Sequence, residues 1–158
     1  MHGANRTGRP FTGDHAGILL YKTLYKFGFS NSEKSESLND NLILNNCRIT
    51  NAVKCLPPDN KPNFMEIKNC NKFLQSEIKE LKKGSILLAL GLIAHNAIVT
   101  ALNLTKKEYK FSHGSRHNLP NNLIMYDSYH CSRYNTQTKR LTEKMFDEVF
   151  LSIKTEME

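Results

Sequence analysis

The stretch SILLALG, residues 85–91, constrains the fold of this chain more than any other part of the sequence. It is apolar at every position from Ile86 to Leu90 and is closed by a glycine. A strand with one face in solvent alternates apolar and polar residues, whereas a short continuous apolar run is typical of a strand buried on both faces. We therefore expect a strand in the interior of a sheet that helices cover on both sides.

Helix-like and strand-like patterns alternate around this stretch. Apolar residues recur at helical spacing in some segments, and others are rich in the residues that favour strands. The predicted helices are residues 14–27, 64–81, 92–102 and 142–153, and the predicted strands are residues 47–53, 85–91 and 122–130. Strands that alternate with helices indicate an α/β fold with a parallel sheet.

Several loops of unusual composition follow the predicted strands. Residues 50–62 (TNAVKCLPPDNKP), 91–95 and 128–135 (SYHCSRYN) all come at or after a strand end, where the functional loops of α/β folds lie. The opening segment HGANRTGRPFTGD, residues 2–14, has the same character but no strand before it. The pattern therefore predicts that a first strand of the fold is missing from the sequence.

The charge of the chain favours a polyanionic partner. Its 158 residues carry a formal net charge of +7, with a pI of about 9.3, and basic residues gather in the opening loop and in residues 104–140. Nucleic acid fits this distribution, while a basic surface that serves only solubility is the alternative. No apolar run approaches the ~20 residues of a membrane helix, and no signal-peptide core is present, so we expect no membrane association and a cytoplasmic location.

The four cysteines, at positions 47, 55, 70 and 131, form no Cys-x-x-Cys pair. In a chain without an export signal, free thiols are more common than a disulfide framework. Cys55 and Cys70 stand apart because both flank PPDNKP, a segment whose prolines exclude a helix or an inner strand.

Three side chains fit the needs of a nucleobase pocket, which are an aromatic face, an amide and a group that stabilises developing charge. Phe11, Asn51 and His130 offer these from different loops. Each also has a structural alternative: a core aromatic, an amide in a turn, and a buried histidine with ordinary partners. Asp14 also fits a helix N-cap, and Arg133 a solvated surface charge. Their joint placement beside successive strands favours the functional interpretation.

Three motifs, GANRTGRPFTGD, ITNAVKCLPPDNKP and SYHCSRYNTQTKRLT, resemble the uracil-DNA glycosylase superfamily, and most of all its iron–sulfur type 5 group. They occur in the family's order and extend over nearly the whole chain. The resemblance implies one domain over residues 1–158, built as a three-layer α/β/α sandwich on a parallel four-stranded sheet. It also implies a base-excision repair enzyme that flips uracil, or another deaminated base such as hypoxanthine, out of DNA and hydrolyses its N-glycosidic bond.

The resemblance assigns roles to particular residues. Cys55 and Cys70 match two of the four ligands of the family's 4Fe–4S cluster, and Lys139 stands where the family usually has glycine. The implied catalytic residues are Asp14, Asn51 and His130, the implied base-binding residues are Phe11, Asn51 and Gly3, and the implied DNA-binding residues are Arg6, Ser132, Arg133 and Asn135.

The sequence also departs from the family at its start. The family has a strand, a glycine-rich loop and two early cysteines ahead of GANRTG, whereas this sequence has Met1 and His2. We therefore expect a domain that is incomplete at its N-terminus, assembles no cluster by itself and releases little uracil. Two alternatives stay open: a catalytically weak or inactive remnant that binds DNA, and a chain that takes the missing strand and cysteines from a second chain.

Overall fold

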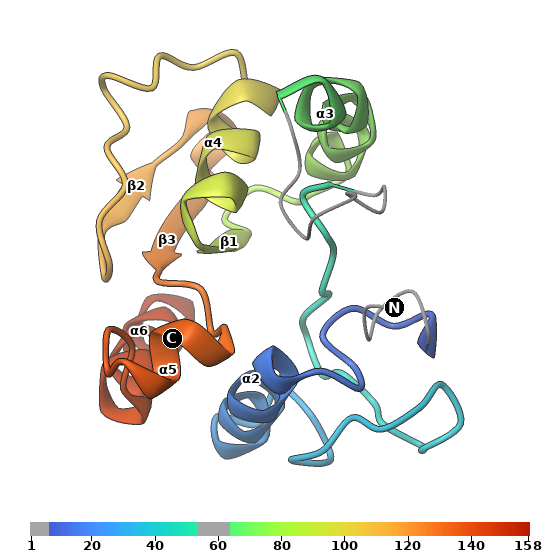
Figure 1. The fold of residues 1–158 in the computed structure, drawn as a ribbon. Coiled ribbons are helices and arrows are strands. Elements are labelled where there is room, and N and C mark those ends of the chain that lie inside the picture. Colours follow the sequence, from blue (N-terminus) through green and yellow to red (C-terminus); the bar gives the residue numbers. More distant parts are fainter. Residues whose placement is uncertain (1–6, 54–63) are drawn as a thin grey trace. The chain divides into compact units, whose positions relative to one another are not determined.

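A computed structural model describes residues 7–53 and 64–158 of the chain (Figure 1). The chain divides into two compact units: Met1–Thr50 together with His130–Glu158 form unit 1, and Asn51–Tyr129 form unit 2. Gly3, Arg6 and Cys55, which carry three of the predicted roles, lie outside the described residues.

The sheet of unit 2 contains β1 (Ile86–Leu90), β2 (Arg116–Asn118) and β3 (Ile124–Ser128) in the order β1-β3-β2. β1 and β3 run parallel, with Ile86 opposite Ile124 and Leu90 opposite Ser128. β2 pairs with the other edge of β3 in the antiparallel direction. The apolar run at residues 85–91 therefore forms a strand, as predicted, and it pairs with β3, which lies within the predicted strand at residues 122–130. Within the described sheet, however, β1 is an edge strand and only Ala89 is fully buried, so the prediction of an interior strand buried on both faces is wrong.

Helices α3 (Phe64–Lys79) and α4 (Leu92–Ala101) complete unit 2. α4 packs against β1 and α3 packs against α4, as the ribbon shows (Figure 1). α4 begins directly after Gly91, whose φ of 95° only glycine adopts readily. Apolar side chains from both helices and both parallel strands form the core, which includes Leu74, Ile78, Ala89, Ala97, Ile98, Val99 and Met125.

Unit 1 is helical and contains α2 (His15–Lys26), α5 (Arg133–Gln137) and α6 (Glu143–Met157). α2 packs on α6, and the apolar faces of the two helices supply buried residues such as Leu24 and Phe146. The Phe150 ring lies at 5.1 Å from that of Phe146 and 6.2 Å from that of Phe29. Pairs of aromatic rings at these separations pack favourably, so Phe29, just after α2, contributes to the packing against α6.

The predicted α/β class is confirmed, and the four predicted helices are present with ends that differ by a few residues. The described sheet is mixed rather than wholly parallel as predicted, because β2 runs antiparallel to β3. The predicted strand at residues 47–53 is wrong, because the described chain there is irregular and lies outside the sheet. A strand exists only through hydrogen bonds to a neighbour, and no strand of the described sheet pairs with these residues. β2 was not predicted, since three residues are too few to display an alternating pattern.

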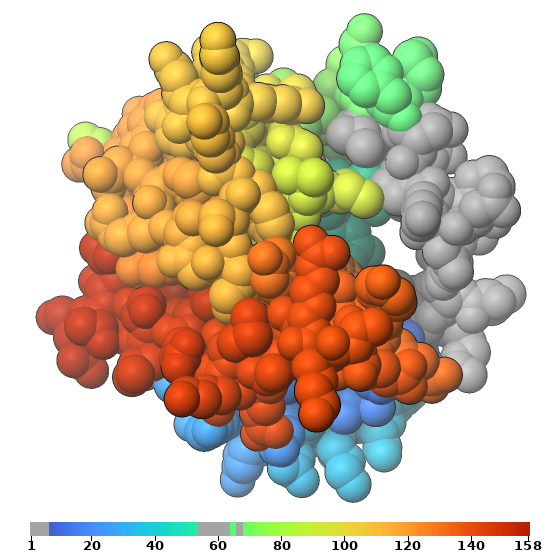
Figure 2. All heavy atoms as spheres, turned by 60° about the vertical axis from the view of Figure 1, so that its left-hand side comes forward, coloured from blue at the N-terminus to red at the C-terminus, as the bar shows by residue number. Residues whose placement is uncertain are grey.

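The segment between α4 and β2 lies largely on the surface of unit 2 (gold in Figure 2). The segment carries three exposed lysines, Lys106, Lys107 and Lys110.

Among the helices of the described residues, none is long and apolar enough to span a membrane.

Candidate active site

Phe11 occupies a turn ahead of α2 in unit 1. The amide of Thr12 donates to the carbonyl of Arg9 at 3.3 Å, which closes a four-residue turn with Pro10 and Phe11 at its centre. Phe11 has φ of 56°, in the left-handed region that favours glycine. A bulky side chain is rare in this conformation, and such strain persists only where surrounding contacts enforce it.

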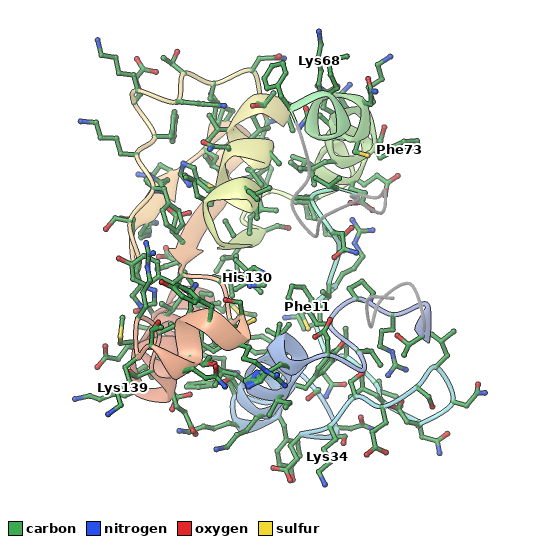
Figure 3. All side chains as sticks on the ribbon, viewed as in Figure 1. Phe11, Lys34, Lys68, Phe73, His130 and Lys139 are labelled. Carbon is green, nitrogen blue, oxygen red and sulfur yellow. The ribbon has the colours of Figure 1, made fainter. Side chains whose placement is uncertain are left out.

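His130 faces Phe11 across unit 1, although the two residues are far apart in sequence. Their ring centroids are 5.8 Å apart and the ring planes are inclined by 32°, and Figure 3 shows the two side chains next to each other. Burial lowers the pKa of His130 below its ordinary value, and the charge of Asp14 opposes this shift only in part. The imidazole is therefore neutral at neutral pH, with one N–H available as a donor.

Asp14 is the N-cap of α2, as the structural alternative for this residue predicts. Its Oδ1 accepts from the amide of Gly17 at 3.1 Å, and the residue is exposed. The same carboxylate acts electrostatically on both His130 and Cys131. Helix capping and a role beside His130 are thus compatible, because the cap uses only one of the two carboxylate oxygens.

The loop that follows His130 is held by its own polar side chains. Ser132 caps α5 by accepting from the amide of Asn135 at 3.3 Å. The side-chain amide of Asn135 donates to the carbonyl of His130 at 2.9 Å. Arg133 is exposed at the first position of α5. Of the predicted DNA-binding residues in this loop, Ser132 and Asn135 therefore have a positioning role within the loop, whereas Arg133 projects from it.

Asn51 lies in unit 2, where it is partly buried in irregular chain rather than at the end of a strand. Phe11, Asp14 and His130 belong to unit 1. The base-binding role of Asn51 stays a prediction, as do the roles of Gly3 and Arg6 outside the described residues.

The described cysteines do not form the ligand set of a four-iron cluster, which takes four thiolates. Cys70 is the only described cysteine of unit 2, and its side chain is 1% exposed on α3. In unit 1, burial raises the pKa of Cys131 to about 12 and also raises the pKa of Cys47. Both thiols are therefore protonated at neutral pH.

A polar network in unit 2 was not foreseen from the sequence. Asp127, whose side chain is fully buried on β3, accepts from His95 of α4 at 2.8 Å and from His117 of β2 at 2.9 Å. The second ring nitrogen of His95 lies 2.8 Å from the carbonyl of Tyr109 and donates to it, because a carbonyl only accepts. The three side chains have the types that bind metal ions, but here the same atoms bond to one another, so we assign them a structural role.

The sequence also gave no indication of the ion pair between Arg9 and Asp40 in unit 1, with Nη1–Oδ1 at 2.9 Å. Burial would raise the pKa of Asp40, but hydrogen bonds from the Glu36 amide, Arg9 and other backbone amides outweigh it and hold the pKa well below its ordinary value. Asp40 lies in a loop rich in serine and asparagine, where an aspartate often organises turns through its carboxylate, but the sequence does not indicate that it pairs with Arg9.

Comparison with known proteins shows the family to which the chain is similar. The family model described as "Uracil DNA glycosylase superfamily" matches residues 1–154. The Type-5 uracil-DNA glycosylase of Thermus thermophilus is 44% identical over 154 residues, which are 97% of this chain and 69% of the relative. The corresponding protein of Pyrobaculum aerophilum is 39% identical over 148 residues, 94% of this chain and 64% of the relative.

A third relative, the Type-5 uracil-DNA glycosylase of Mycobacterium leprae, is 36% identical over 155 residues, 97% of this chain and 68% of the relative. The chain thus spans about two thirds of the length of these curated relatives. The predicted family and enzyme class are confirmed by a family model and by relatives that agree over nearly the whole chain. This protein belongs to the uracil-DNA glycosylase superfamily.

Proposed function

We propose that this chain removes uracil from DNA by hydrolysing the N-glycosidic bond between the base and deoxyribose. The observation that carries the proposal is the pairing of Phe11 with His130, whose ring centroids are 5.8 Å apart. An aromatic face beside a neutral N–H donor is the combination that holds a flipped base and stabilises charge on its oxygen. The family and the names of the similar proteins support the same reaction.

In the proposed reaction, the C1′–N1 bond breaks and its electron pair leaves with uracil, so that negative charge develops on the base and positive charge on the sugar. Phe11 stacks on the base, and the imidazole N–H of His130 donates to the uracil oxygen as it gains charge. Because burial lowers the pKa of His130, the ring donates without binding a proton first. The donor is held in place before the reaction begins, which is how such groups accelerate it.

Asp14 supplies negative charge on the sugar side of the proposed site. Its second carboxylate oxygen, which the helix cap does not use, is free of the Gly17 contact and can orient the water that attacks C1′. The water's proton is taken up by this carboxylate, and the departing base anion is protonated by solvent. Asn51 is proposed to bind the base through its amide, and Arg133, exposed on α5, to bind a phosphate of the DNA.

The test is uracil release from an end-labelled oligonucleotide with the protein in excess, so that even a slow single-turnover reaction is detected. We expect release by the chain, and a loss of about 10²-fold or more in His130→Ala, as removal of one preorganised donor produces. Lys144→Ala, which changes an exposed side chain on α6 of the same unit, is the matched control and should keep the rate. An oligonucleotide containing hypoxanthine tests the second base.

The proposal fails if folded protein releases no uracil above the level of buffer alone, or if His130→Ala releases it as fast as the unaltered chain. Circular dichroism of both proteins establishes that they are folded before rates are compared. Loss of activity in Lys144→Ala as well would also count against a specific role for His130.

A further inference from the structure

The conformation of Phe11 requires an external support. Pro10 and Phe11 are the central residues of the turn from Arg9 to Thr12, and the third position of a turn with positive φ is normally glycine. Phe11 has no such freedom, yet φ is 56°. The contacts that surround the turn must therefore hold it, since strain of this kind is not maintained by the turn alone.

Arg9 connects the turn to the loop that follows α2. Its Nη1 donates to Oδ1 and Oδ2 of Asp40 at 2.9 and 3.0 Å, and to Oγ of Ser35 at 2.9 Å. The side chains of Arg9 and Asp40 are only 16% and 13% exposed. A charge-assisted contact of this kind, largely shielded from water, is stronger and more directional than an exposed ion pair.

Asp40 also organises the loop from which it projects. Its Oδ2 accepts from the amides of Glu36 and Ser37 at 2.7 and 3.2 Å, and its Oδ1 accepts from the amide of Leu42 at 3.1 Å. The carboxylate of Asp40 is thus held in place by backbone donors and also forms an ion pair with Arg9. Removing its charge weakens both sets of contacts at once, because every donor faces the same two oxygens.

Two further contacts pin the backbone of the turn. The hydroxyl of Tyr21 on α2 donates to the carbonyl of Pro10 at 2.9 Å. The carbonyl of Phe11 lies so close to Gly17 that a Cβ at this position would be 1.8 Å from its oxygen. Contacts with α2 and with the loop that contains Asp40 therefore hold the turn in place.

We propose that Asp40, acting through Arg9, is the positioning residue that holds Phe11 in its strained turn and thereby keeps the ring facing His130. The inference rests on the proposed function, because positioning matters for catalysis only if Phe11 stacks on the base. Asp40 contacts no reacting atom in this scheme, so its effect reaches the base only through the conformation of Phe11.

The test is a double-mutant cycle of Asp40→Asn and Phe11→Ala, measured as the single-turnover rate of uracil release. Asp40→Asn alone should slow release by about tenfold, while the affinity for DNA, measured by fluorescence anisotropy, changes less than twofold. In the Phe11→Ala background, Asp40→Asn should slow release no further, because residues that act through one another are not additive. Equal effects of Asp40→Asn in both backgrounds would overturn the proposal.

Two comparisons separate positioning from a general loss of stability. Arg9→Lys keeps a cation for Asp40 and should retain most of the rate that Arg9→Met loses. Glu143→Gln removes the exposed Lys22–Glu143 ion pair of the same unit, whose N–O distance is 2.9 Å, and should leave the rate unchanged. If Arg9→Lys is as slow as Arg9→Met, or Glu143→Gln as slow as Asp40→Asn, positioning is refuted.

A measurement without substrate distinguishes failure of this inference from failure of the proposed function. The ring of Phe11 shifts the NMR signals of the His130 imidazole protons, which are assigned by comparison with His130→Ala. Asp40→Asn should move these signals toward their positions in Phe11→Ala. Unmoved signals refute positioning even if the chain is active, whereas moved signals in a chain that releases no uracil leave positioning intact and refute only the proposed function.

Discussion

At the scale of single residues, burial determines the protonation of the two groups that follow β3. Desolvation disfavours a charge on either side chain, so the pKa of the His130 imidazole falls and the pKa of the Cys131 thiol rises to about 12. Both groups are therefore neutral at neutral pH. A neutral imidazole can donate a hydrogen bond to an oxygen on which negative charge develops. The protonated thiol of Cys131 carries no charge and is fully buried in the core.

The lowered pKa of His130 predicts that acid destabilises the fold of unit 1. As pH falls through about 6.5, the unfolded chain binds a proton at this histidine before the folded chain does, so the free energy of unfolding decreases until the lower pKa of the folded state is passed. Urea unfolding at several values between about pH 8 and pH 5 measures this loss. His130→Asn should lose less stability over the same range, and equal losses in the two proteins would contradict the prediction.

At the scale of elements, the C-terminus of α5 explains why the residue type at position 139 matters. Thr138 is the C-cap, and Lys139 follows it with φ of 57° while its amide donates to the carbonyl of Thr136 at 3.3 Å. This is the position at which helices most often end in glycine, because a Cβ is disfavoured in the left-handed region. The glycine expected from the family resemblance therefore has a conformational reason, and Figure 3 labels the lysine that replaces it.

Lys139→Gly should stabilise the protein, because glycine relieves the strain at positive φ by more than it adds freedom to the unfolded chain. We expect an increase of about 0.5–1 kcal/mol in the free energy of unfolding. Urea unfolding measures it, with Lys139→Ala as the matched control, which removes the charge without relieving the strain. An equal gain in both variants would assign the effect to charge rather than to backbone conformation.

A second element-scale prediction concerns the network that joins α4, β2 and β3. Asp127→Asn replaces one of the two accepting oxygens by an NH2 group, so the side chain can accept from only one of His95 and His117. Removing one partner of a buried polar pair costs about 3 kcal/mol, so urea unfolding should show a loss of this order. Glu108→Gln, which alters an exposed acid of the same unit, should change stability little; a comparable loss there would refute a specific role for the network.

At the scale of the whole molecule, the net charge of +7 acts on DNA through the number of phosphates that the protein contacts. Each contact releases bound counterions, so the logarithm of the binding constant falls with the logarithm of salt concentration by about 0.9 per contact. A surplus of positive charge therefore increases the affinity and the rate of encounter for any DNA sequence, while the groups that bind the base determine which base is removed.

Arg133→Ala should reduce the salt slope of DNA binding by about 1, because it removes one phosphate contact. Fluorescence anisotropy over a range of salt concentrations measures the slope. Lys144→Ala removes the same charge from α6 and serves as the control. An unchanged slope in Arg133→Ala, or the same decrease in both variants, would exclude a specific phosphate contact at Arg133.

Local patterns of the sequence were sufficient for the elements that depend on nearby residues. The strand formed by the apolar run at β1 and the N-cap Asp14 both follow from interactions within a few residues. The motifs around Phe11 and His130 likewise identified the family. By contrast, a strand at residues 47–53 was predicted from composition alone, although pairing with a distant segment decides whether a strand forms.

The sequence by itself determined the α/β class, most helix boundaries and the residue types of the site. Only the tertiary structure showed that Phe11 and His130 face each other and that Asp40 forms an ion pair with Arg9. It alone also showed that two histidines bond to the buried carboxylate of Asp127. The reason is that periodicity and capping record contacts between neighbours in the chain. Contacts between distant side chains depend instead on how the elements pack, and a single sequence carries no local pattern that marks them.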